Sequence, residues 1–485
     1  MENIVQLENS YYQLGSDFYQ QISPEPVIQP QLFLWNEALA DGCQIGPDIK
    51  QDAAQYFSGN ATLDGSIPLA QAYAGHQFGG FNPQLGDGRA HLLGELILPN
   101  GRRVDLQLKG SGATQFSRRG DGRCAFKPAV REYLMSEAMY ALGVPTTRTL
   151  AVVTTGETLY RELTEPGAIV TRIAQSHIRI GTFQYFAAQG DSQSLSTLLD
   201  YAIARHYPEI DLDDERRAIL FLDAVIEQQI KTIVHWMRVG FIHGVMNTDN
   251  MTISGETIDY GPCAMLGVYH PETVFSSIDG NGRYCFANQP SIMQWNMARL
   301  AECLIPLIEG DKDAVIKQLE QRIVNITEQY KSAYYQMMHN KLGLLTLGHN
   351  ELVDELLDLM QLNKLDYTQQ FYELTQVVSM SDPSLTQLDP EWLDKWLAIV
   401  RQDQSARDSN MAKSLALMQT NNPVIIPRNH HVEKVLEQCK QTGSNDSALD
   451  FLKVLRKPYE QQEATALYQD LPLDHDNGYQ TFCGT

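Results

Sequence analysis

The spacing of hydrophobic and polar positions changes along the chain and separates a β-rich part from a helical part. Apolar and polar residues alternate in Arg103–Lys109, which follows the apolar run His91–Leu98 after the turn sequence Asn100-Gly101. Alternation next to an Asn-Gly turn is typical of a β-hairpin. Residues Arg131–Leu142 instead place apolar side chains at helical spacing, and a Gly and a Pro follow directly. This pattern predicts a helix that ends there.

Beyond residue 190 the pattern is mainly helical. Glu215–Val239 predicts a long amphipathic helix that leads directly to His243, and Ile292–Ile308 and Asp311–His339 predict two more. The order of these patterns predicts an α+β protein with a small β-rich lobe before a larger helical lobe. We predict an N-terminal extension at 1–64, a nucleotide-binding β-rich lobe at 65–165, a helical lobe at 166–430, and a helical extension with a Cys-containing tail at 431–485.

Composition restricts the partners and the location of the protein. Of the 485 residues, 43% are hydrophobic and 20% charged, as in globular proteins. A formal net charge of −22 argues against a general affinity for nucleic acid or for an anionic membrane. We expect no signal peptide, because the acidic start Met1-Glu-Asn lacks the pattern of one, and no membrane span, because no apolar run approaches the ~20 residues that a span requires. We therefore expect a protein located in the cytosol. We also expect it to be a monomer.

One segment reverses the overall charge. Residues 101–131 contain eight Lys or Arg residues and two acidic residues, and Arg172 and Arg179 follow later in the chain. Concentrated cations suit a polyphosphate ligand, whereas a basic surface loop is the alternative interpretation. Within this segment Asp121 lies between two glycines, where it could bind a ribose, a base edge or an arginine.

The region from residue 243 to residue 261 resembles a kinase active site with one part moved. Kinase-like loops carry an Asp base two residues after the His and a metal-binding Asn five residues beyond that Asp. Asn250 occupies the Asn position, but Val245 stands where the Asp belongs, and Asp249 directly precedes the Asn. Asp259 lies in Thr257–Gly261, which we predict as a short strand that ends in a magnesium-binding Asp before a Gly.

A phosphate-binding region precedes this loop in the expected order. Gly86 and Gly88 would let backbone amides approach phosphate oxygens, although a plain turn is the alternative. Lys109 ends a predicted strand, where a kinase-like fold places a phosphate-binding Lys that pairs with a helix Glu. The following helix offers Glu132 and Glu137, and the pattern does not separate them.

Five motifs now identify a family. The chain closely resembles the selenoprotein O family, also called YdiU, in Tyr73-Ala-Gly-His-Gln-Phe-Gly79, Pro83-Gln-Leu-Gly-Asp-Gly-Arg-Ala90, Asp105-Leu-Gln-Leu-Lys-Gly-Ser-Gly112, Phe116-Ser-Arg-Arg-Gly-Asp-Gly-Arg123 and His243-Gly-Val-Met-Asn-Thr-Asp-Asn250. The resemblance implies a protein-kinase-like two-lobe fold that binds ATP in a flipped orientation. It also implies transfer of AMP to Ser, Thr or Tyr hydroxyls of proteins.

The resemblance assigns roles to individual residues. It implies that Asp249 accepts the proton, that Asn250 and Asp259 bind Mg²⁺ or Mn²⁺, and that Glu132 is the partner of Lys109. Manganese could permit UMP transfer. The nucleotide-binding residues that it implies are Gly86, Gly88, Arg89, Lys109, Asp121, Gly122, Arg172, Arg179 and Asp259.

The sequence leaves alternatives for the role of the cysteines and for the reaction. The family has a Cys or selenocysteine near the C-terminus, matched by Cys483, and this thiol is either a redox group or an ordinary tail residue. Some members carry a second Cys where this chain has Thr273–Ser277, and Cys263 is the nearest substitute. The alternatives to AMP transfer are a conventional ATP-dependent kinase, against which Val245 argues, and a non-catalytic nucleotide-binding pseudokinase.

Overall fold

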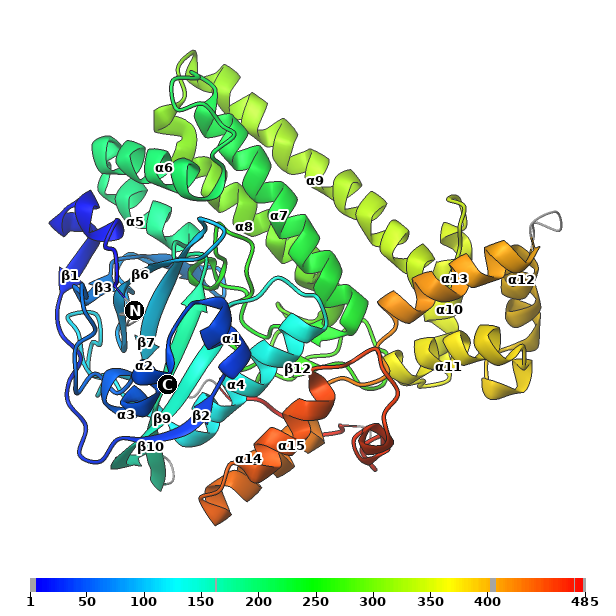
Figure 1. The fold of residues 1–485 in the computed structure, drawn as a ribbon. Helices are drawn as coiled ribbons and strands as arrows, with labels where there is room; N and C mark the ends of the chain where they lie inside the picture. Colours follow the sequence, from blue (N-terminus) through cyan, green and yellow to red (C-terminus); the bar gives the residue numbers. More distant parts are fainter. Residues whose placement is uncertain (1–5, 162–163, 402–406, 475, 483–485) are drawn as a thin grey trace.

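The computed structural model describes residues 6–161, 164–401, 407–474 and 476–482. It is an α+β structure in which an antiparallel sheet is followed by mostly helical chain (Figure 1). No helix in these ranges is long and apolar enough to cross a membrane.

The sheet is built around the predicted hairpin. β6 (Ala90–Ile97) pairs antiparallel with β7 (Arg103–Lys109), which confirms the alternation-based prediction. Along the sheet the strand order is β1-β3-β6-β7-β10-β9-β2, and β8 pairs with β10. The remaining strands are β1 (Tyr19–Gln21), β2 (Gln31–Trp35), β3 (Leu69–Gln71), β8 (Cys124–Ala125), β9 (Arg148–Tyr160) and β10 (Thr164–Ala174).

The first 64 residues contribute to this sheet. β1 pairs with β3 at one edge, and β2 pairs with β9 at the other, so the N-terminal segment flanks the sheet on both sides (Figure 1). Three short helices follow β2, namely α1 (Glu37–Gly42), α2 (Pro47–Gln51) and α3 (Ala53–Tyr56). At the other end of the sheet, β10 extends nine residues past the boundary predicted at residue 165.

One long helix packs against the sheet. α4 (Phe126–Ala141) contacts β9 and β10, and it begins at Phe126 rather than at the predicted Arg131. It ends just before the Gly and Pro that predicted its end. Its other side is covered by α14 (Asn429–Thr442) and α15 (Asp446–Leu455), which lie below it in Figure 1.

The predicted helices of the second part are confirmed. α7 (Arg217–Val239), α8 (Gln289–Leu304) and α9 (Lys312–Lys341) pack on one another, and α9 leads to a group of helices at one end of the molecule (Figure 1). The other helices are α5 (Ile180–Gln189), α6 (Ser192–His206), α10 (Asn350–Leu362), α11 (Tyr367–Met380), α12 (Pro390–Val400) and α13 (Arg407–Asn421).

The prediction of a short strand at Thr257–Gly261 is wrong. Only Thr257 takes part in β-bridges, to Met251 and to Thr146. Asp259 has a φ of 63°, in the left-handed region, and this conformation interrupts an extended strand. The Asp therefore projects from an irregular turn.

Candidate active site

The loop at residues 243–250 is held by buried contacts. α7 ends at Val239, the two-residue strand β11 (Phe241–Ile242) follows, and His243 comes next. His243 stacks on Trp236 with ring centroids 5.3 Å apart, and its Nε2 lies 2.8 Å from the carbonyl oxygen of Ile258. His243 thus joins this loop to the turn that carries Asp259, and its role in the structure is positional.

A cavity of about 730 Å³ collects the predicted site residues. Its lining includes eight Lys or Arg side chains and five Asp or Glu side chains, although the whole chain carries a net charge of −22. An excess of cations favours an anionic ligand. Among the lining residues are Gly86, Gly88, Arg89, Lys109, Asp121, Gly122, Glu132, Arg172, Arg179, Asp249, Asn250 and Asp259.

Four charged side chains form a network on one wall of this cavity. Lys109 Nζ lies 2.8 Å from Glu132 Oε2 and 2.8 Å from Asp259 Oδ1. Arg172 contacts the same two carboxylates, and its Nη2 lies 2.5 Å from Asp259 Oδ1. Burial opposes the ionisation of Asp259, but Arg172, Lys109 and Arg179 hold its pKa well below its ordinary value. Asp259 is therefore a carboxylate at neutral pH.

The helix glutamate that contacts Lys109 is Glu132. Glu137 points elsewhere and binds Arg148, with its Oε1 2.6 Å from Arg148 Nε. Burial opposes ionisation of Glu132 as well, yet Arg172 and Lys109 hold its pKa below its ordinary value. Two cations thus face two carboxylates in this wall.

Asp249 is a further carboxylate that lines the cavity. Gln77 Nε2, on the hairpin formed by β4 (Gly75–Gln77) and β5 (Gly80–Asn82), donates to Asp249 Oδ2 at 3.1 Å. Asp249 Oδ1 is buried and has no hydrogen-bond partner among the described residues. Burial raises the pKa of Asp249 to about 6, and Arg179 opposes this shift. A carboxylate with one unpartnered oxygen and this pKa can accept a proton.

Two glycines of the cavity allow close packing between loops. Gly86 has a φ of 70°, and a Cβ there would lie 2.2 Å from Cγ of Phe116. Gly122 has a φ of 68°, and a Cβ there would lie 2.1 Å from the carbonyl of Gly112. The side chain of Asp121, which lies between Gly120 and Gly122 in the sequence, binds both terminal nitrogens of Arg161 at 2.8 Å. In this structure the partner of Asp121 is thus an arginine.

The oxygen donors at the predicted metal position fit a hard cation. Asn250 and Asp259 both line the cavity. Asn250 donates through Nδ2 to Val245 O at 3.0 Å, so its amide oxygen is the atom left for a ligand. Lys109 and Arg172 both contact Oδ1 of Asp259, and no hydrogen bond from the described residues reaches Oδ2. Amide and carboxylate oxygens are the ligands that Mg²⁺ prefers.

Two residues of the candidate active site were not assigned from the sequence. Gln77 holds Asp249, and the ring of Tyr73 lies beneath the Arg179 guanidinium at 4.3 Å. Both residues belong to the motif at residues 73–79, which was the available signal in the sequence.

The two cysteines singled out in the sequence differ in what the structure shows. Cys483 lies outside the described residues. Cys263 is buried, which raises its pKa to about 11, so its thiol is protonated at neutral pH.

Comparison with known proteins gives a consistent result. A family model described as Protein adenylyltransferase SelO matches residues 3–456. The chain is 50% identical over 491 residues to a protein nucleotidyltransferase YdiU of Teredinibacter turnerae, with 99% of this chain and 100% of that protein covered. Proteins of the same name from Rhizobium etli and Halalkalibacterium halodurans are 49% and 48% identical, each with 99% of this chain and 97% of the relative covered.

Proposed function

We propose, from the premise that this chain belongs to the SelO family of protein adenylyltransferases, that it transfers AMP from ATP to Ser, Thr or Tyr hydroxyls of other proteins. The chain is a protein nucleotidyltransferase, and the family implies ATP as its substrate. The acceptor oxygen forms a bond to the α-phosphorus, the bond from the α-phosphorus to the β-phosphate oxygen breaks, and pyrophosphate leaves.

The position of Asp249 carries this proposal. Kinase-like loops place the base two residues after the His, but that position is the buried Val245. Asp249 lies in the cavity with an unpartnered oxygen, so the proton-accepting group is displaced from the usual position. A base in this displaced position supports a reaction in which the acceptor hydroxyl attacks the α-phosphorus rather than the γ-phosphorus.

The cations of the cavity suit the charge that develops in this reaction. Pyrophosphate carries away more negative charge than a single phosphate, and fixed guanidinium and ammonium groups stabilise it as it leaves. Arg172, Lys109 and Arg179 are buried, so their charges act in an environment with a lower effective dielectric constant than bulk water. We assign to them the binding of the β- and γ-phosphates, with Gly86, Gly88, Arg89, Asp121 and Gly122 completing the nucleotide site.

We propose Asn250 and Asp259 as the residues that would hold Mg²⁺ or Mn²⁺. A bound divalent cation would supply electrostatic stabilisation to the phosphate oxygens. Asp249 would orient the acceptor hydroxyl and take its proton, while Gln77 keeps the carboxylate in place. The antiparallel sheet before the helical part, with the cavity lined from both, supports a protein-kinase-like two-lobe architecture.

Labelled ATP tests this function. The purified protein is incubated with Mg²⁺, an acceptor protein and, in parallel, α- and γ-labelled ATP, and intact masses are measured. Label from the α position alone, with a mass gain of one AMP, is the expected result. Label from the γ position would establish a kinase, and bound ATP without any label would establish a nucleotide-binding pseudokinase. A parallel reaction with UTP and Mn²⁺ tests UMP transfer.

A further inference from the structure

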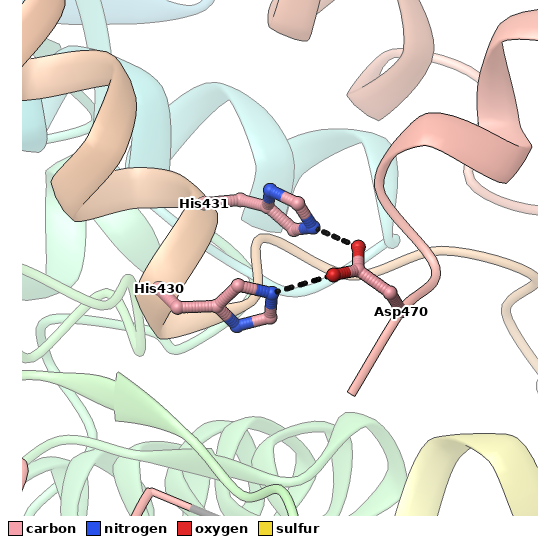
Figure 2. A group of neighbouring side chains, drawn as sticks. All are labelled: His430, His431 and Asp470. Carbon is pink, nitrogen blue, oxygen red and sulfur yellow. Dashed lines mark hydrogen bonds and ion pairs between the residues drawn. The ribbon is translucent and has the colours of Figure 1, made fainter. Parts of the chain in front are cut away.

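Two histidines and a carboxylate converge outside the catalytic cavity. His430 and His431 lie in the first turn of α14, and Asp470 follows the short helix at Glu463–Leu467. His431 Nε2 is 2.6 Å from Asp470 Oδ1, and His430 Nε2 is 3.6 Å from Asp470 Oδ2. One carboxylate thus faces both rings, with one oxygen toward each (Figure 2).

His430 lacks the partners that a shielded imidazole needs. Both of its ring nitrogens are shielded from solvent, and neither makes a hydrogen bond with the described residues. The 3.6 Å contact to Asp470 is too long to count as one. An unpaired polar group that is shielded from water destabilises the folded state. A ligand bound to Nε2 would supply a partner for one of these two nitrogens.

The three donors are close to the arrangement around a tetrahedral ion. One donor atom from each residue lies within 4.8 Å of the other two. Donors at ~2.0–2.1 Å from a tetrahedral zinc ion lie about 3.3 Å apart. The Asp470 side chain is 63% exposed, so its carboxylate can move. Such a movement would lengthen its 2.6 Å contact with His431 and shorten its 3.6 Å contact with His430.

We propose that His430, His431 and Asp470 bind a divalent transition metal ion of the zinc class, with water as the fourth ligand. Imidazole nitrogen suits zinc and similar ions, whereas Mg²⁺ and Ca²⁺ select oxygen ligands. The donor set therefore differs in kind from the Asn250 and Asp259 oxygens in the cavity. This site does not depend on which group the enzyme transfers.

The ion would fasten the C-terminal segment to the helical part. Beyond Asp470 the chain continues to Tyr479, whose hydroxyl lies 3.0 Å from Glu433 Oε1 on α14. Thr481 Oγ1 then donates to Pro262 O at 2.6 Å, three residues after Asp259. A metal at Asp470 would thus hold α14 and the segment that contacts the Asp259 turn in one position. We assign the ion a structural role.

Zinc content and thermal unfolding test this site in the full-length protein. The protein is stripped with EDTA, incubated with ZnCl₂ in the presence of Mg²⁺, desalted, and analysed for zinc by mass spectrometry. We expect about one zinc ion per chain at this site. At a zinc concentration one hundred times Kd, Tm should rise by about 2–3 °C.

Matched variants locate the binding. Asp470→Asn and His430→Gln should lose the bound zinc and the rise in Tm. Asp474→Asn, an exposed acid on the same segment, and His270→Gln, an exposed histidine elsewhere, should keep both. The circular dichroism spectrum of each variant checks that it is folded. Absence of retained zinc in the unaltered protein, or equal zinc in Asp470→Asn and Asp474→Asn, would overturn the proposal.

Discussion

A single methyl group at Gly75 should disturb the proposed base without contacting the charged network of Lys109, Glu132, Arg172 and Asp259. Gly75 begins β4, and a Cβ there would lie 2.9 Å from Asp249 Oδ1, 3.0 Å from Leu85 Cδ1 and 3.1 Å from Asp249 Cβ. All three distances are shorter than ordinary van der Waals contacts, so the carboxylate has to shift by a few tenths of an ångström. Gly75 has no positive φ, so Gly75→Ala adds crowding without backbone strain.

The size of the effect follows from this displacement. A misplacement of about 1 Å can cost roughly 100-fold in rate, so a shift of a few tenths should lower kcat about three- to tenfold. Overpacking should reduce the free energy of unfolding by about 1–3 kcal/mol, which leaves the protein folded. The Kd for ATP should change less than about twofold, because the methyl group contacts no residue of the charged network.

The assay compares Gly75→Ala with Gly80→Ala. Gly80 lies on the paired strand of the same hairpin, and a Cβ there would meet only Gln77 O, at an ordinary 3.5 Å. Initial rates of AMP incorporation at saturating ATP give kcat, and isothermal titration calorimetry gives Kd. Equal kcat values for the two variants would refute the inference that the position of Asp249 limits transfer. A parallel loss of ATP affinity would show instead that Asp249 acts on the nucleotide.

Five other substitutions test the roles of charged side chains. Asp259→Asn should abolish transfer and weaken Mg²⁺-dependent ATP binding, whereas Asp249→Asn should abolish transfer alone, and calorimetry with and without Mg²⁺ separates these outcomes. Glu132→Gln and Glu137→Gln should each lower the free energy of unfolding, measured in urea, by about 3 kcal/mol. Glu132 pairs with the buried Arg172, and the buried Glu137 pairs with the half-buried Arg148. Only Glu132→Gln should also slow transfer. Burial lowers the pKa of Lys341 well below its ordinary value, so between the folded and the unfolded pKa the unfolded chain binds a proton that the folded chain lacks. The free energy of unfolding should therefore rise with pH up to about 10, and Lys341→Met should flatten this rise in pH-dependent urea titrations.

Local patterns predicted the elements that are themselves local. The β6–β7 hairpin and α7 were predictable because alternation, a turn dipeptide or helical spacing lies within one short stretch. The pairing of β2 with β9 was not, since Gln31 meets Thr154 across more than one hundred residues and a five-residue strand carries no signal of its partner. The turn at Asp259 was mistaken for a strand because a left-handed φ at a non-glycine residue leaves no trace in composition.

The same distinction applies to the site. The motifs indicated Lys109 and Asp259, but not which glutamate of α4 contacts the lysine. Glu132 and Glu137 are 4% and 2% exposed, so both sides of this helix are buried and hydrophobic periodicity does not orient it. The choice depends on the rotation of α4 against β9 and β10, which long-range packing determines.

The covering of α4 by α14 and α15 has a consequence for biosynthesis. The ribosome completes the sheet strands and α4 by residue 174, but the helices that cover α4 end only at residue 455. At a synthesis rate of roughly 5–20 residues per second, about 15–60 s pass between the synthesis of residue 174 and that of residue 455. Throughout that interval its apolar surface and the partners of Glu433 and Glu437, namely Arg131 and Lys127, remain uncovered on the nascent chain. Chaperones that bind exposed apolar helices therefore have a defined period in which to act on this protein.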